Sequence, residues 1–255
     1  MEKKFTKDLL TVRAFETRAE MGAAAAADIA ACIQKELAAK PFINMIFAAA
    51  PSQNEVLAAL AADPGIPWER VRAFHMDEYI GLSADAPQGF GNFLRAHLFG
   101  LVPFAEVNTI DVTASDPEAE AGRYAALLAA CPADIVVMGI GENGHIAFND
   151  PPVADFRDPR AVKPVRLDEV CRQQQVHDGC FAALADVPEY ALTLTVPTLF
   201  RAPHLFCVVP AATKAPAVRE TLTGTVDEHC PASILRRHAD AVLYLDAQSA
   251  SLLEF

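Results

Sequence analysis

The feature that most constrains the fold is the stretch from Ile135 to Pro152, with the sequence IVVMGIGENGHIAFNDPP. It opens with a continuous apolar run, which is typical of a strand buried on both faces of a parallel sheet. Gly139, Gly141 and Gly144 follow the run, and glycine lets a ligand approach the main chain closely. Because ligands of open α/β sheets bind at the carboxyl ends of the strands, the stretch predicts a buried strand with a site at its end.

Polar side chains suited to acid–base chemistry belong to the same stretch. Asn143 lies between the last two glycines, and His145 and Asp150 come after them. An ordinary strand-to-helix turn that happens to hold a histidine is the alternative interpretation. The coincidence of glycines, a histidine and an acid in one segment favours a site.

Apolar runs and helical segments alternate along the rest of the chain. This alternation predicts an α/β fold, a three-layer αβα sandwich with a mostly parallel, Rossmann-like sheet. No repeat or linker divides the chain, so residues 1–255 are expected to form a single domain. Further strands are expected at residues 42–48, 68–74, 107–112, 191–196, 205–209 and 241–245, and helices at or within 14–40, 52–60, 83–103, 116–130, 167–184, 216–222 and 225–238.

Local signals add three expectations. Ser52 and Glu55 have the spacing of a capping box, which predicts a helix start directly after the first of these strands. Asp246 is expected to cap a terminal helix. Residues 151–164 are rich in Pro, Asp and Arg, and form a loop that could cover a site.

Ionisable side chains also follow two other predicted strands. His75, Asp77 and Glu78 come directly after the strand at 68–74, where a solvated acidic loop is the alternative interpretation. Lys214 follows the strand at 205–209. In a parallel sheet, these strand ends meet the end of the 135–138 run at one edge.

The composition fits a well-buried globular protein, with 52% hydrophobic and 21% charged residues. No stretch reaches the roughly 18 to 20 apolar residues that a membrane span requires. The first residues are of mixed charge and lead into no signal-peptide core. These features predict a cytoplasmic protein.

The formal charge of −12 repels nucleic acid and anionic membranes, so neither is an expected partner. A phosphorylated substrate would need a local cluster of positive charge. The six cysteines form no C-x-x-C pair and none has zinc-ligand spacing with a histidine. They are expected to be small buried residues in a reducing compartment, and no metal site is expected.

Two motifs resemble the glucosamine-6-phosphate deaminase/isomerase family. They are HMDEYIGL at residues 75–82 and GIGENGHIAFNDP at residues 139–151. The VPEYALT segment at 187–193 and Lys214 also fit, so the resemblance covers nearly the whole chain. The sister 6-phosphogluconolactonase branch usually continues as Gly-His-Thr-Ala-Ser where this chain has Gly-His-Ile-Ala-Phe-Asn, which favours the deaminase branch.

The resemblance implies an aldose–ketose isomerase that converts an amino-sugar phosphate, glucosamine 6-phosphate by default, into a ketose phosphate and ammonia. No metal or organic cofactor is needed for this reaction. The expected partner is a small-molecule sugar phosphate, and a homo-oligomer is expected by analogy only.

Roles for individual residues also follow from the resemblance. Asp77 would be the base that moves a proton between C2 and C1, and His145 would relay a proton during ring opening. Asp150 would orient that histidine, and Lys214 would hold the phosphate. The remaining implied residues are Asn143 and Glu78 in the catalytic group, and Ser52, Gly141, Gly144, Arg172 and His177 in the substrate-binding group, where Arg172 and His177 are open alternatives for the family's phosphate-binding arginine.

The chain departs from the family pattern in places that leave the substrate open. Asn143 stands where the best-known members have an aspartate, and Asp150 is one methylene shorter than the family's glutamate. The glycine-containing phosphate loop of the family is replaced by AAPSQ at 49–53, and Glu55 adds negative charge nearby. The alternatives are therefore a different phosphosugar or a sugar acid, a 6-phosphogluconolactonase-type hydrolase, or a non-catalytic sugar-phosphate sensor.

Overall fold

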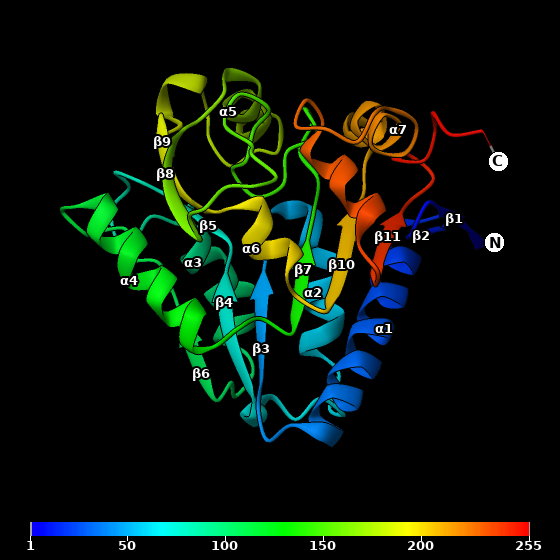
Figure 1. The fold of residues 1–255 in the computed structure, drawn as a ribbon, viewed down its shortest axis with the longest axis horizontal. Coiled ribbons are helices and arrows are strands. Elements are labelled where there is room, and N and C mark those ends of the chain that lie inside the picture. Colours follow the sequence, from blue (N-terminus) through cyan, green and yellow to red (C-terminus); the bar gives the residue numbers. More distant parts are fainter. Residues whose placement is uncertain (1, 255) are drawn as a thin grey trace.

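A large central sheet organises the protein, whose computed structural model describes residues 2–254 (Figure 1). Its eight strands lie in the order β1-β2-β11-β10-β7-β3-β4-β6, and all neighbours are parallel except β1 and β2. The predicted α/β fold with a mostly parallel sheet is confirmed. The strands are β1 (Lys3–Lys7), β2 (Leu10–Ala14), β3 (Ile43–Phe47), β4 (Val71–His75), β6 (Glu106–Asn108), β7 (Ile135–Met138), β10 (His204–Val209) and β11 (Ala241–Leu245).

Helices cover both faces of this sheet and complete three layers. The first three helices pack on one face, in one hydrophobic cluster, and α4, α6 and α7 pack on the other, in a second cluster. The helices are α1 (Arg18–Ala39), α2 (Asn54–Ala61), α3 (Phe90–Leu94), α4 (Pro117–Ala130), α5 (Glu169–His177), α6 (Val196–Phe200) and α7 (Ala215–Thr223). No described helix has the length and apolar character needed to cross a bilayer.

Strand β7 is buried on both faces, as its apolar run predicted. Ile135 and Val137 pack into the cluster with α1 and α2, whereas Val136 and Met138 pack into the cluster with α4 and α7. This alternation is the period of a strand. Because β7 lies between β3 and β10, the segment that follows it emerges in the middle of the sheet edge.

A second, antiparallel sheet lies beyond the carboxyl ends of the central strands, at the upper left of Figure 1. It consists of β5 (Asp77–Tyr79), β9 (Tyr190–Leu194) and β8 (Val162–Arg166), in that order. The strand expected at 191–196 therefore forms in this small sheet. Strand β8 occupies the end of the segment expected to be a loop, because its backbone pairs with β9.

Several expected boundaries were wrong. Helix α1 begins at Arg18, and residues 10–14 form β2 because they pair with β1 and β11. The capping box lies at Thr17 and Glu20 of α1. Ser52 makes no cap, and Glu55 instead forms an ion pair with Arg18 at 2.8 Å.

The C-terminal expectation was also wrong. Within the described residues no helix follows β11. Asp246 instead accepts a hydrogen bond from the backbone N–H of Ser249 at 2.7 Å, and two at 3.2 Å from that of Ala211. Its carboxylate thus ties the end of β11 to the segment after β10. The segment expected as a helix at 225–238 forms only the short 3₁₀ helix Pro231–Arg237.

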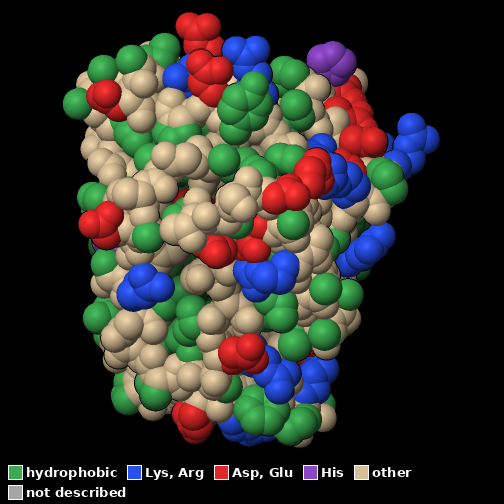
Figure 2. All heavy atoms as spheres, turned by 90° about the vertical axis from the view of Figure 1, so that its left-hand side faces the viewer, with side chains coloured by type: hydrophobic (Ala, Val, Ile, Leu, Met, Phe, Trp, Pro, Cys, Tyr) green, Lys and Arg blue, Asp and Glu red, His purple; other side chains and the backbone are tan. Residues whose placement is uncertain are grey.

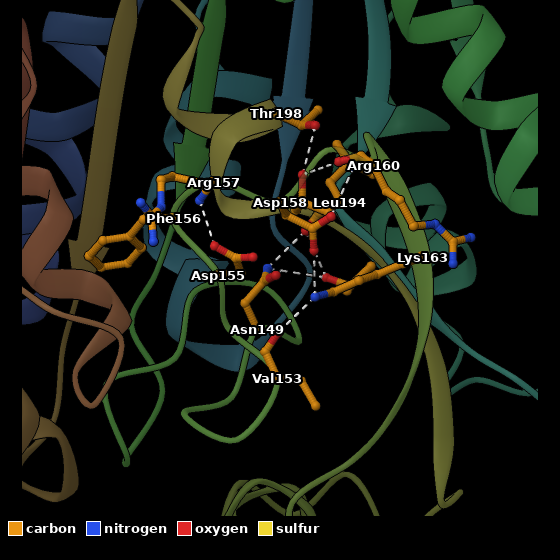
Figure 3. A network of polar contacts seen from close by, with 12 residues as sticks. Asn149, Val153, Asp155, Phe156, Arg157, Asp158, Arg160, Lys163, Leu194 and Thr198 are labelled. Carbon is orange, nitrogen blue, oxygen red and sulfur yellow. Dashed lines mark hydrogen bonds and ion pairs between the residues drawn. The ribbon is translucent and has the colours of Figure 1, made fainter.

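The segment between β7 and β8 is fastened to the small sheet, as Figure 3 shows. The ammonium group of Lys163 on β8 donates to the carbonyl of Val153 and to the Asp158 carboxylate, both at 2.7 Å. Asn149 donates to the carbonyl of Leu194 at 2.8 Å. These contacts fix the segment between β7 and β8 against the small sheet.

The face over α4 and the small sheet carries charges of both signs. Figure 2 shows Lys and Arg side chains interspersed with Asp and Glu on this face. The pictured face therefore offers no continuous basic surface of the kind that nucleic acid binds.

The close packing of α1 on α2 leads to the first prediction. A Cβ atom at Gly22 in α1 would lie 2.5 Å from the Cβ of Glu55 in α2. Gly22→Ala should therefore lower the free energy of unfolding by about 1–3 kcal/mol through overpacking. Urea denaturation of the purified protein measures this change.

Gly122 in α4 is the matched control, because nothing lies within 4 Å of a Cβ built there. Gly122→Ala should raise the free energy of unfolding by up to about 1 kcal/mol through helix propensity alone. Equal stabilisation by both substitutions would contradict the close approach of α1 and α2.

Candidate active site

A pocket opens where the carboxyl ends of four central strands converge. It lies at the point where the chain order reverses, since β3, β4 and β6 follow one another outwards on one side and β7, β10 and β11 on the other. Ligands of open α/β sheets bind at such switch points. The lining residues are Ala48, Ala49, Ala50, Ser52, Gln53, Met76, Asp77, Phe90, Gly139, Ile140, Gly141, His145, Ala147, Phe148, Gln174, Gln175 and Lys214.

The structure brings five of the eleven residues to which the resemblance assigns a role to this pocket: Ser52, Asp77, Gly141, His145 and Lys214. They come from the segments after β3, β4, β7 and β10. The other six candidates do not line it. Two of those, Asn143 and Asp150, contact His145 from behind.

His145 is held by a network of polar side chains. Its ring Nδ1 lies 2.7 Å from Oδ1 of Asn143 and 3.0 Å from Oδ1 of Asp150. The amide group of Asn143 donates to Asp150 at 3.0 Å and to Asp168 at 3.4 Å. Since the amide nitrogen faces two carboxylates, the amide oxygen faces the histidine.

This arrangement selects one tautomer of His145. Both neighbours of Nδ1 are hydrogen-bond acceptors, so Nδ1 carries the proton. The lone pair of Nε2 is then free, and the ring lines the pocket. The imidazole is therefore arranged to accept a proton from a ligand at Nε2.

Two glycines leave room for this arrangement. A Cβ at Gly141 would lie 2.0 Å from the His145 ring, so the ring packs directly against the Gly141 backbone. Gly144 has a φ of +82°, and a Cβ there would lie 2.7 Å from Sγ of Cys230. Gly144 thus shapes the turn before His145 without lining the pocket.

The two aspartates at this site have opposite electrostatic environments. Burial, with a smaller contribution from Glu78, raises the pKa of Asp77 well above its ordinary value. Burial also acts to raise the pKa of Asp150, but His145, the Asn143 amide and the backbone N–H of Asp168 outweigh it and lower that pKa. Asp150 is thus held as a carboxylate, whereas Asp77 holds a proton more readily.

Glu78 points away from the pocket. Its carboxylate accepts backbone N–H groups from Tyr79 at 2.9 Å, Phe90 at 3.0 Å and Gly91 at 2.8 Å. It therefore fixes the start of α3, which brings Phe90 to the pocket wall. His75 is equally structural, because its Nε2 accepts the N–H of Ile110 at 2.8 Å and burial lowers its pKa to about 4.

Lys214 supplies positive charge to the pocket. It is only 3% exposed, and its ammonium group has no hydrogen-bond partner among the described residues. Burial lowers its pKa, and the charges of Asp178 and Glu142 oppose that effect. A buried ammonium without a partner is costly unless an anion binds to it.

Neither open alternative for a second phosphate-binding residue reaches the pocket. The guanidinium of Arg172 donates to the carbonyls of Leu184 at 2.9 Å and Val187 at 2.8 Å. His177 lies beside Glu142 at 3.3 Å. The charge of Glu55, expected to oppose an anion here, is paired with Arg18 and does not line the pocket.

The sequence of the chain matches one protein family over most of its length. The sequence model described as Glucosamine-6-phosphate isomerases/6-phosphogluconolactonase matches residues 16–244. The chain belongs to this family.

Relatives within the glucosamine-6-phosphate isomerase/6-phosphogluconolactonase family are similar over most of the chain. A glucosamine-6-phosphate deaminase of Exiguobacterium sibiricum is 39% identical over 183 residues, 72% of this chain and 71% of that protein. A glucosamine-6-phosphate deaminase of Listeria innocua is 34% identical over 211 residues, 83% of this chain and 88% of that protein. A solved structure described as a monomeric glucosamine-6-phosphate deaminase is 28% identical with a TM-score of 0.86, over 95% of this chain and 99% of that one.

Phe90, Phe148, Gln174 and Gln175 are among the lining residues that the sequence did not single out as candidates. The two aromatic rings stack with their centroids 5.5 Å apart. Only the glutamines carried a signal, because they are polar residues in a helix that covers the strand ends. The segment at 151–164, expected as a loop that could cover a site, does not line the pocket.

Atoms of His145, Asp150 and Cys171 lie within 4.8 Å of one another. Their protons account for this cluster without a metal ion. Nδ1 of His145 carries a proton between two acceptors, and burial raises the pKa of the Cys171 thiol well above its ordinary value, with further contributions from Asp150 and Asp77. The three groups therefore form one buried polar cluster.

The contrast between the two aspartates predicts opposite effects on stability. The pKa of Asp77 rises on folding from its ordinary value of 3.8. Such an acid lowers the stability of the fold progressively as the pH rises above 3.8 towards the pKa of the folded state. Asp77→Asn removes this loss, so the thermal midpoint at pH 7 should rise by several degrees. Thermal unfolding followed by circular dichroism from pH 4 to pH 8 measures the effect.

Asp150→Asn is the matched variant and should act in the opposite direction. Because the pKa of Asp150 falls on folding, its contribution is present above pH 4 and is lost as the pH falls through its folded pKa. The variant should therefore have a lower thermal midpoint at pH 7. A rise with both variants would mean that the His145–Asp150 pair does not stabilise the fold.

Proposed function

We propose that this chain converts glucosamine 6-phosphate and water into fructose 6-phosphate and ammonia. The observation that carries the proposal is the convergence of Asp77, His145 and Lys214 on one pocket. A carboxylate base, an oriented imidazole and a buried ammonium are the groups that enolisation of a phosphosugar requires. Membership of the family, and the deaminase relatives at up to 39% identity, support the same reaction.

His145 would open the sugar ring. Its Nε2 takes the proton of the C1 hydroxyl while the bond between C1 and the ring oxygen breaks, and the same proton passes to that oxygen. The carboxylate of Asp150, 3.0 Å from Nδ1, stabilises the imidazolium that forms in between. Asn143 fixes the ring orientation through its bond at 2.7 Å.

Asp77 would move the proton between carbons. Its carboxylate takes the C2 proton of the open-chain aldehyde and delivers it to C1, while a proton of the amino group passes to O1. C1 is thereby reduced to an alcohol, and C2 is oxidised to an imine. Water then adds to C2, and ammonia leaves. Burial raises the pKa of Asp77, which makes its carboxylate a stronger base than that of an exposed aspartate.

Lys214 would bind the phosphate as a point charge, with the Ser52 hydroxyl as a further ligand. Gly141 would let the His145 ring lie against the backbone at the pocket, while Gly144 and Glu78 would act through the shape of the site. We do not assign Arg172 or His177 to the phosphate, because their side chains are bonded elsewhere. The proposed steps are proton transfers, additions and eliminations, for which no cofactor is needed.

The proposal also covers the cellular compartment and the oligomeric state of the enzyme. We expect the enzyme to act in the cytoplasm, where its six free cysteines would stay reduced. A homo-oligomer remains an expectation by analogy, and one solved relative is described as monomeric.

Ammonia release and ketose formation from glucosamine 6-phosphate test the proposal, with galactosamine 6-phosphate measured in parallel. We expect turnover of glucosamine 6-phosphate and a loss of about 10²–10⁴-fold in kcat for Asp77→Asn. Asp85→Asn, which changes an exposed acid, is the matched control and should keep full activity.

Two outcomes would overturn the proposal. Equal rates for the wild type and Asp77→Asn would remove Asp77 from the chemistry. Absence of turnover with both amino sugars would shift the assignment to another phosphosugar or to a sugar acid.

A further inference from the structure

The anion-binding end of the pocket contains a single Lys or Arg. Lys214 is the only one among the lining residues in the described part of the chain. A phosphate monoester presents three terminal oxygens, each able to accept more than one hydrogen bond. One ammonium group cannot satisfy them, so neutral donors must complete the site.

Helix α5 presents one polar face to the site. Cys171, Gln174 and Gln175 are its buried residues, at the i, i+3 and i+4 positions that share a helix face. Gln174 and Gln175 line the same pocket as Lys214. The polar face of α5 and the segment after β10 therefore border one common space.

The two lining glutamines differ in what their amides do. Gln174 accepts the N–H of Glu142 at 2.8 Å and donates to Asp178 at 3.3 Å, so its amide is already used. Gln175 is 7% exposed and lines the pocket, yet its side chain makes no hydrogen bond to any described residue. The amide of Gln175 is therefore available to a ligand in the pocket.

We propose that Gln175 is the second anchor of the substrate's anionic end, beside Lys214 and the Ser52 hydroxyl. This inference rests on the proposed function for the identity of the substrate. Gln175 donates its amide N–H groups to the phosphoryl oxygens. It thereby takes the role of the second phosphate-binding residue, for which the sequence left Arg172 and His177 as alternatives. The anchor then carries one positive charge, and the amide supplies directed hydrogen bonds.

Gln175→Glu tests the role, because it keeps the shape while removing the donors and adding negative charge. With glucosamine 6-phosphate we expect KM to rise at least tenfold and kcat to change much less. Gln173→Glu is the matched control on the same helix: it adds the same charge at a residue that does not line the pocket. It should leave KM within about twofold.

Inorganic phosphate provides a second measurement that needs no turnover. Titration calorimetry should show phosphate binding to the wild type and to Gln173→Glu, and binding at least tenfold weaker to Gln175→Glu. Gln175→Arg should retain or tighten binding. The thermal midpoint of each variant without phosphate shows whether the fold is intact.

The outcomes distinguish the proposed role of Gln175 from the proposed deamination of glucosamine 6-phosphate. Phosphate affinity and KM unchanged in Gln175→Glu would overturn the role of Gln175 while leaving deamination intact. A fall in kcat and thermal midpoint without a change in phosphate affinity would assign Gln175 a structural role only and would also overturn the inference. Loss of phosphate binding in Gln175→Glu, together with a wild type that does not deaminate glucosamine 6-phosphate, would support the anchor and overturn the proposed substrate.

Discussion

The burial of β7 on both faces is the constraint on which the site depends. Its four apolar residues alternate between the two hydrophobic clusters, which places the strand between β3 and β10 in the centre of the sheet. A parallel sheet aligns the carboxyl ends of its strands, so the segments after β3, β7 and β10 must meet. The pocket is the space that they leave at the reversal of chain order.

Electrostatic differences between neighbouring groups give this pocket its chemical character. Asp77 and Asp150 are both buried, but only Asp150 is surrounded by the His145 imidazole and hydrogen-bond donors that lower its pKa. Burial without such partners makes Asp77 a proton acceptor of raised pKa, whereas the partnered aspartate serves to orient His145. Asn143 completes the arrangement, because its amide joins two carboxylates on one side and the imidazole on the other. The asparagine can thus orient the ring without adding charge of its own.

The proposed substrate anchor uses helix α5 in addition to the segment at 49–53. The segment at 49–53 lacks the glycines that the family resemblance led us to expect, and Glu55 in the same turn is neutralised by Arg18. The polar face of α5 borders the same pocket as this segment, and it brings an unpaired amide to the same space as the unpaired ammonium of Lys214. The buried face of α5 is polar where it borders the pocket, at Gln174 and Gln175.

The sequence by itself determined the fold class, the central strand and the family, since these depend on local apolar periodicity and on residues contiguous in the chain. It also indicated Asp77, His145 and Lys214, because each follows a predicted strand and parallel strands end at one edge. Tertiary structure alone decided which candidates face the pocket. Glu78 adjoins Asp77 in sequence but points the other way, since neighbouring residues of a strand lie on opposite sides. Arg172 and Gln175 lie on one helix, and only the rotation of α5 about its own axis turns the amide towards the pocket and the guanidinium towards the carbonyls of 184 and 187. That rotation is set by packing between segments distant in sequence, which no local pattern encodes.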